Sequence, residues 1–279
     1  SSPSVRLTPA DRAALRQRVT EAIDAIHAGV VDKVVLASSL TVTPARRTDA
    51  VAVLARLRAR QPGTLPFLIQ LDADRTFVGA TPERLAAVRG TTVRTMALAG
   101  SARRDCDPEV DRALGDALLA SAKDRAEHRW VVDAIRSALA PVAADVSAPD
   151  GPVLRRLATI QHLETPIAAR LAHPVHLLDL AAMLHPTPAL GGAPRDPALA
   201  LIRRLEGQSR GWYGGAVGVM RGEGEGELAV AIRCLLLHGA QATAFAGAGI
   251  VAGSDADAEV AEIELKLGAA LDVLREPDR

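Results

Sequence analysis

The chain has 279 residues, which is enough for one large domain or two modest ones. It carries 33 basic and 33 acidic residues and only 2% aromatic residues, so nothing in it indicates a surface for nucleic acid or anionic lipid. Its two cysteines make no disulfide framework, and it has no apolar run of about 20 residues and no signal peptide, so we expect a cytoplasmic protein outside the membrane.

The first half of the chain is predicted to alternate helices with short strands. Thr8 is a suitable N-cap and Pro9 suits the first helical position, so the first helix begins there. The predicted helices are 8–27, 48–60 and 108–138, the last as one long helix or two abutting ones. The predicted strands are 30–42, 66–71, 76–79, 85–88 and 93–97, with the last four forming two hairpins.

The second half begins with a proline- and alanine-rich segment, 141–152, which we expect to be a connection. Segment 185–197 holds four prolines and a Gly-Gly pair and is predicted to be an ordered loop. The remaining predicted strands are 153–163, 214–220, 228–238 and 242–251, and the remaining helices are 174–184, 198–205 and one after 255. Because strands cluster in two groups without a steady βαβ alternation, the pattern favours an α+β fold with largely antiparallel sheets.

The last strand and helix, 245–266, place glycines and charged residues side by side. Gly247 and Gly249 interrupt an apolar strand, which is typical of a close approach by a ligand or another backbone. On the helix, Glu259, Glu262 and Lys266 fall in one sector beside the apolar stripe. The simpler interpretation, a surface helix with a Glu-Lys pair four residues apart, stays open at this point.

Four further clusters could carry chemistry, and each also has a structural interpretation. Lys33 interrupts an apolar strand, where it could be a desolvated base or extend to water. Glu83 follows a Gly-Ala-Thr-Pro turn, where a solvated carboxylate is the common case. Asp124 and Glu127 lie one turn apart, either as a solvated face or as ligands of a hard divalent cation. Segment 185–194 could line a pocket or be a rigid connection.

Motifs for dinucleotides, nucleoside triphosphates and serine hydrolases are absent from the sequence. Taken together, the clusters resemble one family, the chorismate-binding enzymes, which includes isochorismate, salicylate, anthranilate and aminodeoxychorismate synthases. The resemblance runs from about residue 11 to residue 274. Its most specific pieces are GATPERL (79–85), LAGSARR (98–104), KDRAEH (123–128), HLETP (162–166), HPTPALGGAPR (185–195), RGWYGGAVG (210–218) and AGAGIVAGSDADAEVAEIELK (246–266).

The resemblance implies a fold of two stacked, largely antiparallel β-sheets flanked by helices, with the pocket between them. Residues 1–279 are expected to form a single chorismate-binding domain. Family members usually carry a longer N-terminal part that completes one sheet, so we expect an N-terminal extension to be missing from this sequence.

Within the family, the closest similarity is to isochorismate synthases, which convert chorismate to isochorismate. Lys33 falls where water-adding members carry a lysine, and Ala189 where ammonia-using members carry a threonine. The resemblance implies that Lys33 deprotonates a water that attacks ring carbon C2, while Glu83 protonates the departing C4 hydroxyl. These roles require a lowered pKa for the lysine and a raised pKa for the glutamate.

The resemblance also implies a magnesium site and a set of substrate contacts. Mg²⁺ is expected at Glu127 and Glu262, with Asp124 and Glu259 bonding to its waters. The residues expected to contact the dianionic substrate are Gly100, Ser101, His162, Ala189, Tyr213, Arg233, Gly247, Gly249 and Lys266. We expect a monomer that needs no glutamine amidotransferase.

Two alternatives stay open. One is a salicylate synthase, which forms isochorismate and then eliminates pyruvate in the same pocket. The other is a non-catalytic family member kept for binding or assembly. Ser38, Ile263 and Glu164 depart from residues usual in the family, which leaves the rate and product open.

Overall fold

The structure is a computed structural model, and it describes residues 7–274. Its helices are α1 (Pro9–His27), α2 (Ala50–Arg60), α3 (Pro108–Ala120), α4 (Ala122–Leu139), α5 (Leu177–Leu184), α6 (Arg195–Glu206) and α7 (Ala256–Leu271), with short 3₁₀ turns at Gly222–Gly224 and Asp272–Leu274. None of the helices in the described part of the chain combines the length and apolar character that crossing a bilayer requires.

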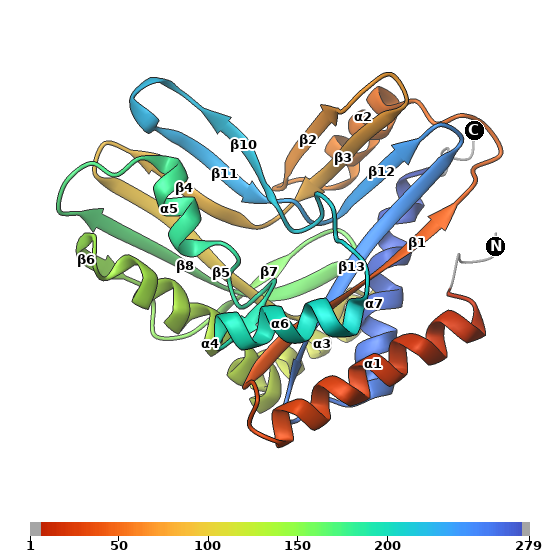
Figure 1. Cartoon of the computed structure of the whole chain (residues 1–279), viewed down its shortest axis with the longest axis horizontal. Helices are drawn as coiled ribbons and strands as arrows, with labels where there is room; N and C mark the ends of the chain where they lie inside the picture. Colours follow the sequence, from red (N-terminus) through yellow and green to blue (C-terminus); the bar gives the residue numbers. More distant parts are fainter. Residues whose placement is uncertain (1–6, 275–279) are drawn as a thin grey trace.

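Thirteen described strands form two antiparallel sheets (Figure 1). The first sheet has the order β2-β3-β12-β13-β1-β9, with β2 (Leu65–Gln70), β3 (Arg75–Thr81), β12 (Cys234–His238), β13 (Gln241–Val251), β1 (Lys33–Val42) and β9 (Gly192–Ala193). The second sheet has the order β10-β11-β4-β5-β8-β6, with β10 (Ala216–Met220), β11 (Gly226–Val230), β4 (Arg84–Arg89), β5 (Thr92–Arg103), β8 (Ile160–Leu171) and β6 (Ala143–Ser147). Strand β7 (Val153–Arg156) also pairs with β8. The predicted α+β fold is therefore confirmed.

Each sheet has one face covered by helices. On the first sheet, α1, α6 and α7 pack their apolar stripes against β1 and β13, and α2 packs against β2 and β3. On the second sheet, α4 and α5 pack against β4, β5 and β8. The strand period of two therefore sends Val34 and Leu36 of β1 into the helix-covered core, while Lys33, Val35 and Ala37 lie on the opposite face.

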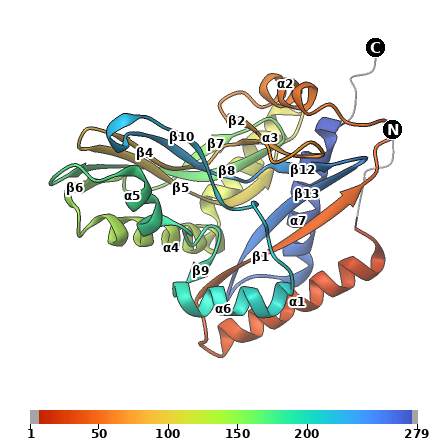
Figure 2. The ribbon, with the colours of Figure 1, turned by 45° about the horizontal axis from the view of Figure 1, so that its top comes forward.

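The uncovered faces of the two sheets meet around a small aromatic cluster. Phe67 and Phe77 have ring centroids 5.5 Å apart, and Tyr213 stacks on Phe245 at the same separation. The chain passes between the sheets twice near this cluster, between β3 and β4 and between β11 and β12. In Figure 2, β4 and β10 of the second sheet lie on one side of the middle of the molecule and β12 of the first sheet lies on the other. The two crossings therefore bring loop residues to the junction of the sheets.

Several predicted boundaries need correction. The predicted strand 153–163 is two strands, and the second continues to Leu171, because β8 is a long central strand paired on both sides. The predicted strand 228–238 is likewise two strands, β11 and β12. The expected connection 141–152 contains β6, which pairs with β8. The expected loop 185–197 contains β9 and the first turn of α6.

The predicted helix 108–138 is two helices that meet at Ser121. This residue ends α3 and is also the N-cap of α4, where its side chain accepts a hydrogen bond from the backbone N–H of Asp124. The second helix begins after this cap, and its buried residues include Glu127 and His128. The break at Ser121 is what aims Glu127 at the junction of the sheets.

Candidate active site

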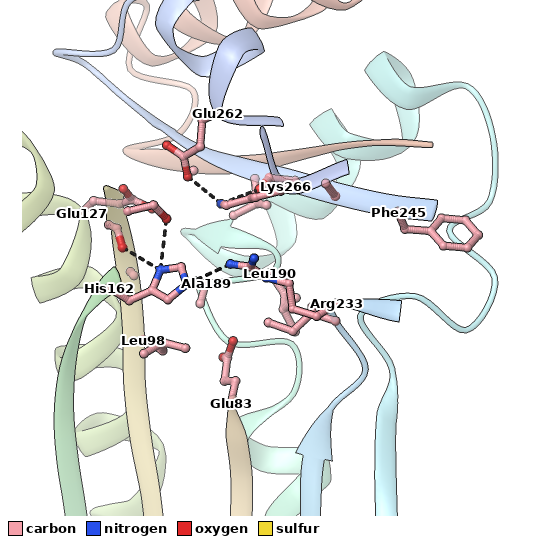
Figure 3. Close-up of a pocket in the computed structure, with 18 of the residues that line it drawn as sticks. Glu83, Leu98, Glu127, His162, Ala189, Leu190, Arg233, Phe245, Glu262 and Lys266 are labelled. Carbon is pink, nitrogen blue, oxygen red and sulfur yellow. Dashed lines mark hydrogen bonds and ion pairs between the residues drawn. The ribbon is translucent and has the colours of Figure 1, made fainter. Parts of the chain in front are cut away.

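A pocket lies at the junction of the two sheets, and we call it the central pocket. Its walls come from β1, β5, β8, β13, α4 and α7, and from the two crossings that carry Glu83 and Arg233. Figure 3 shows Glu262 and Lys266 at one end, Glu83 at the other, and His162 between them. The free volume is about 70 Å³, well below the roughly 300 Å³ and more of typical ligand sites, because charged side chains fill it.

Two unusual backbone positions give the walls their shape. Arg233, directly before β12, has a positive φ of 54°, and its side chain lines the pocket. Gly100, with φ of 76°, lies at a break in the register between β5 and β8. A Cβ atom at Gly100 would also come within 3.2 Å of Asp124 Cβ. Both positions place polar groups at the pocket that a regular ladder would direct elsewhere.

Glu83 forms the acidic end of the central pocket. Its side chain is only 4% exposed, and burial raises its pKa to about 7, against the opposing effect of Lys33, Lys266 and Arg233. Its backbone is fixed on both sides, since its N–H donates to Thr81 Oγ1 and its carbonyl accepts from Val230. A carboxyl group that keeps its proton near neutral pH can donate it to a leaving group.

His162 and Arg233 form a hydrogen-bonded bridge across the pocket. Arg233 Nη2 lies 2.9 Å from His162 Nε2, and a guanidinium can only donate, so Nε2 accepts. The imidazole proton therefore sits on Nδ1, which lies 3.0 Å from the carbonyl oxygen of Gly100 and 3.1 Å from Ser101 Oγ. Burial and the charge of Arg233 lower the pKa of His162, so the ring is neutral and positions the guanidinium.

Glu127 forms the opposite end of the pocket and is paired with Lys33. Lys33 Nζ lies 3.1 Å from Glu127 Oε1, and the lysine side chain is fully buried. Within residues 7–274, Nζ has this charge partner but makes no hydrogen bond of ordinary geometry. The interpretation that Lys33 extends to solvent is therefore wrong. Lys33 does not itself line the pocket, which it reaches through Glu127.

Two more glutamates on α7 are also paired with lysines. Glu262 contacts Lys266 at 2.5 Å, and Lys266 also donates to the carbonyl oxygen of Gly247 at 2.9 Å. Burial alone would raise the pKa of Glu262, but its ion pair with Lys266 outweighs that effect and the pKa is lowered. Glu259 is 1% exposed and accepts from Lys123 and Ser254, and burial raises its pKa despite Lys123.

The carboxylates of α4 and α7 offer a site for a hard cation that is not assembled in this state. Within the described residues, no three Asp, Glu, His or Cys side chains converge as metal ligands. However, Glu127 and Glu262 line the same pocket from two helices, and their oxygen atoms are the ligands that Mg²⁺ prefers. Asp124 lies one turn before Glu127 and contacts Ser121. The donor set fits Mg²⁺ once the lysine pairs separate.

The two glycines of β13 leave room for these groups. A Cβ atom at Gly249 would lie 2.0 Å from Glu127 Oε1 and 3.1 Å from Lys33 Cε. At Gly247 a Cβ would lie 3.2 Å from the hydroxyl of Tyr213, another side chain that lines the pocket. The strand glycines are therefore explained by the close approach of side chains, and the expected close contact is found.

A partly buried arginine, Arg210, joins the loop before α6 to the first sheet in an arrangement that we call the clamp. Arg210 donates to both carboxylate oxygens of Glu206 and to the backbone carbonyls of Leu190 and Val35. Glu206 Oε1 also accepts from the backbone N–H of Ala37 at 2.7 Å. Because Leu190 and Val35 both line the central pocket, the clamp fixes two of its walls.

The sequence model of a family described as chorismate binding enzyme matches residues 2–275. The chain belongs to the chorismate-binding enzyme family.

Relatives and a solved structure agree with this membership. The salicylate biosynthesis isochorismate synthase of Pseudomonas aeruginosa is 42% identical over 257 residues, covering 92% of this chain and 54% of the relative. The isochorismate synthase MenF of Bacillus subtilis is 42% identical over 243 residues, covering 87% and 51%. The structure of a putative 2,3-dihydroxybenzoate-specific isochorismate synthase, DhbC, from Bacillus anthracis superposes with a TM-score of 0.91 at 33% identity, covering 94% and 72%. The chain thus spans about half the length of the curated relatives it matches.

Most residues that the family resemblance singled out lie around the central pocket. Those that line it are Glu83, Gly100, Ser101, Glu127, His162, Ala189, Tyr213, Arg233, Gly247, Gly249, Glu262 and Lys266. Lys33, Asp124 and Glu259 do not line it and reach it through neighbours. The lining residues that sequence reasoning missed are Val35, Leu98, Ala99, Leu190, Ile232, Phe245 and Ala246. For Val35 and Phe245 the strand period was an available signal, since they lie two residues from Lys33 and Gly247.

The three departures from the chorismate-binding pattern have different surroundings. Ile263 is fully buried in the core beneath α7, so it faces away from the pocket. Glu164 lies 3.3 Å from Arg155 on the neighbouring strand β7, which compensates its charge. Ser38 borders Glu206 and Arg210, at the rim of the clamp. None of the three lines the central pocket.

Proposed function

We propose that the chain converts chorismate to isochorismate. The observation that carries this proposal is the opposed arrangement of Glu83, buried with a pKa raised to about 7, and the buried Lys33–Glu127 pair across one pocket. Arg233, beside His162, and Lys266, beside Glu262, supply positive charge to the pocket. The names of the similar proteins, isochorismate synthases, support the same reaction.

The chemistry is an isomerisation in which one water enters and another leaves. Lys33 accepts a proton from a water whose oxygen forms a bond to ring carbon C2. The ring double bonds shift, the bond from C4 to its hydroxyl breaks, and Glu83 donates its proton to the departing oxygen. Each group supplies roughly 10²- to 10⁴-fold in rate. An ammonium cannot accept a proton, so before this step Lys33, now held 3.1 Å from Glu127, must be released and give up its own proton to solvent.

The substrate is expected to meet the cations and donors of the pocket through its two carboxylates. Arg233 is already oriented by neutral His162, and the Tyr213 hydroxyl lies beside Gly247. The remaining proposed contacts are Gly100, Ser101, Ala189, Gly249 and Lys266. A substrate carboxylate can replace Glu262 as the partner of Lys266, which would open the pocket beyond its present 70 Å³.

We further propose that Mg²⁺ is the cofactor. Glu127 and Glu262 would hold it directly, and Asp124 and Glu259 through waters. When bound, the ion neutralises the charge of the ring carboxylate and fixes its position. Excess EDTA is expected to stop turnover and Mg²⁺ to restore it; full activity in excess chelator would reject the metal assignment.

The decisive experiment is incubation with chorismate and Mg²⁺ followed by chromatographic identification of the product. Isochorismate without pyruvate supports the proposal, whereas pyruvate release in step with salicylate would assign the salicylate synthase reaction. Lys33→Ala and Glu83→Gln should each abolish turnover with the fold retained. Glu109→Gln, on a side chain that is 80% exposed, is the matched control and should leave turnover unchanged.

Partners and location stay predictions. Water addition requires no ammonia, so turnover should proceed without glutamine or an amidotransferase. A monomer and a cytoplasmic location are expected, and size-exclusion chromatography with light scattering tests the first.

A further inference from the structure

The chain uses lysine at only three positions. Of its 33 basic residues, all except Lys33, Lys123 and Lys266 are arginine. Each of these lysines forms an ion pair with a glutamate of the proposed Mg²⁺ site, and the partners are Glu127, Glu259 and Glu262 in turn. A chain that otherwise uses arginine therefore keeps lysine only beside these carboxylates, which indicates that the pairs need a property that a guanidinium lacks.

Lysine and arginine differ in how firmly they hold a carboxylate. A guanidinium is a rigid fork that contacts both carboxylate oxygens, as Arg210 does with Glu206 in the clamp. An ammonium is a compact charge at the end of a flexible stem. Of the two side chains, lysine is therefore the one that can leave a carboxylate when a stronger cation arrives.

Lys123 is the lysine of the three that can most easily move into solvent. Its side chain is 29% exposed, whereas that of Lys266 is 14% exposed and that of Lys33 is fully buried. It lies in the first turn of α4, and within residues 7–274 its ammonium makes one hydrogen bond, to Glu259 Oε1 at 2.5 Å. Lys266, by contrast, is also held by the carbonyl oxygen of Gly247. Lys123 can thus leave by breaking a single contact.

The charge of Lys123 acts on all four carboxylates of the proposed Mg²⁺ site. Besides contacting Glu259, it attracts Glu127 and Asp124 of its own helix and Glu262 of α7. Burial alone would lower the pKa of Lys123, but the charges of Glu259, Glu127 and Asp124 outweigh that effect and raise the pKa, so the side chain is a cation. The ammonium therefore neutralises the same oxygen atoms that Mg²⁺ would use.

We propose that Lys123 is an internal counter-ion that competes with Mg²⁺ for the carboxylates of α4 and α7 and moves into solvent when the metal binds. The side chain of Glu259 is only 1% exposed, and a buried carboxylate without a partner is strongly destabilising, so Lys123 stabilises it until a metal arrives. An ammonium and a dication at the same oxygen atoms repel each other. The inference rests on the proposed Mg²⁺ site and not on the proposed reaction.

Isothermal titration calorimetry of the full chain with magnesium chloride, without chorismate, tests the competition. Lys123→Gln removes the charge and keeps a hydrogen-bond donor near Glu259, so it should bind Mg²⁺ about tenfold more tightly than the parent, or better. The matched control is Arg125→Gln, which removes a positive charge from an exposed side chain on the same helix and should stay within about twofold of the parent. Binding by Lys123→Gln that equals that of the parent, or is weaker, would overturn the proposal.

A second measurement uses the parent chain alone. Partial acetylation followed by mass spectrometry reports each lysine separately, because trypsin cleaves at the arginines between them. Saturating Mg²⁺ should raise the acetylation rate of Lys123 by about threefold or more, since an ammonium freed from carboxylates loses its proton more readily. Free Nα-acetyl-lysine in the same solution is the standard. A rate for Lys123 that Mg²⁺ leaves unchanged or lowers would overturn the proposal.

The two measurements separate this inference from the proposed function. If neither the parent nor Lys123→Gln binds Mg²⁺ up to about 20 mM, the metal assignment fails and the inference fails with it. If the parent binds Mg²⁺ and Lys123→Gln binds it no better, the competition alone is wrong. A chain without activity on chorismate would refute the proposed reaction, while calorimetry and acetylation would still decide the role of Lys123.

Discussion

The buried acid Glu83 makes stability depend on pH in a way that one substitution can expose. Its pKa is about 7 in the folded chain, against 4.5 for an ordinary glutamate. Between these values the folded state holds a proton that the unfolded state has lost, so stability falls as pH rises. At 1.36 kcal/mol per pH unit, the 2.5 units between them correspond to about 3.4 kcal/mol in total.

Glu83→Gln removes this dependence because an amide does not titrate. Relative to the parent chain, the variant should gain about 2.5 kcal/mol in free energy of unfolding between pH 5 and pH 8.5. Urea unfolding at half-unit steps of pH measures this difference in free energy of unfolding between parent and variant. For the control Glu109→Gln, the difference from the parent should not change with pH. A gap between parent and Glu83→Gln that is equal at pH 5 and pH 8.5 would refute the assignment of a buried, proton-holding acid. In the parent, turnover should also decline above about pH 7, as Glu83 loses its proton.

Three further predictions follow from the packing. Gly249→Ala should displace Glu127, since the added Cβ would lie 2.0 Å from Glu127 Oε1, and should lower activity at least tenfold; unchanged kinetics would count against the site. The control is Gly268→Ala on α7, where an added Cβ meets no atom within 4 Å. This variant should leave activity intact and raise the free energy of unfolding by up to about 1 kcal/mol. Lys33→Met leaves the buried Glu127 carboxylate without its partner, so it should lower the free energy of unfolding, measured with urea, by about 3–5 kcal/mol. The double variant with Glu127→Gln should recover much of that loss. Additive effects of the two substitutions would mean that the residues are not coupled. Arg210→Leu leaves the buried carboxylate of Glu206 without its charge partner and should lower the free energy of unfolding in urea by about 3–5 kcal/mol. A loss under about 1 kcal/mol would contradict the role of the clamp.

The class of fold could be predicted from the sequence because local periodicity and turn residues agree with it. The alternation in 242–251 and the stripe of α7 both correspond to observed elements. What periodicity could not reveal is where a continuous apolar run is divided. Ser121 splits one helical pattern, and Arg233 with its positive φ splits one strand pattern, because both are set by tertiary contacts and not by composition.

The members of the candidate site were found by family resemblance, whereas their pairing was not. Nothing in the spacing of Lys33 and Glu127 indicates that they form an ion pair, since they meet only when α4 packs beside β13, the strand paired with β1. The Glu262–Lys266 pair was visible from sequence as an i,i+4 contact, but its exposure was not. Burial depends on residues of the second sheet such as Ser101 and His162, which line the same pocket as Glu262 and which a linear pattern does not place there.

The pairing of charges around the central pocket has a consequence for the order in which ligands arrive. Three lysines, Lys33, Lys123 and Lys266, each face a glutamate there, namely Glu127, Glu259 and Glu262. A lone dianion or a lone dication would separate these pairs and leave two uncompensated charges in a poorly solvated space. Together they cancel. Chorismate and Mg²⁺ should therefore bind synergistically, each tightening the other by the same factor in calorimetric titrations.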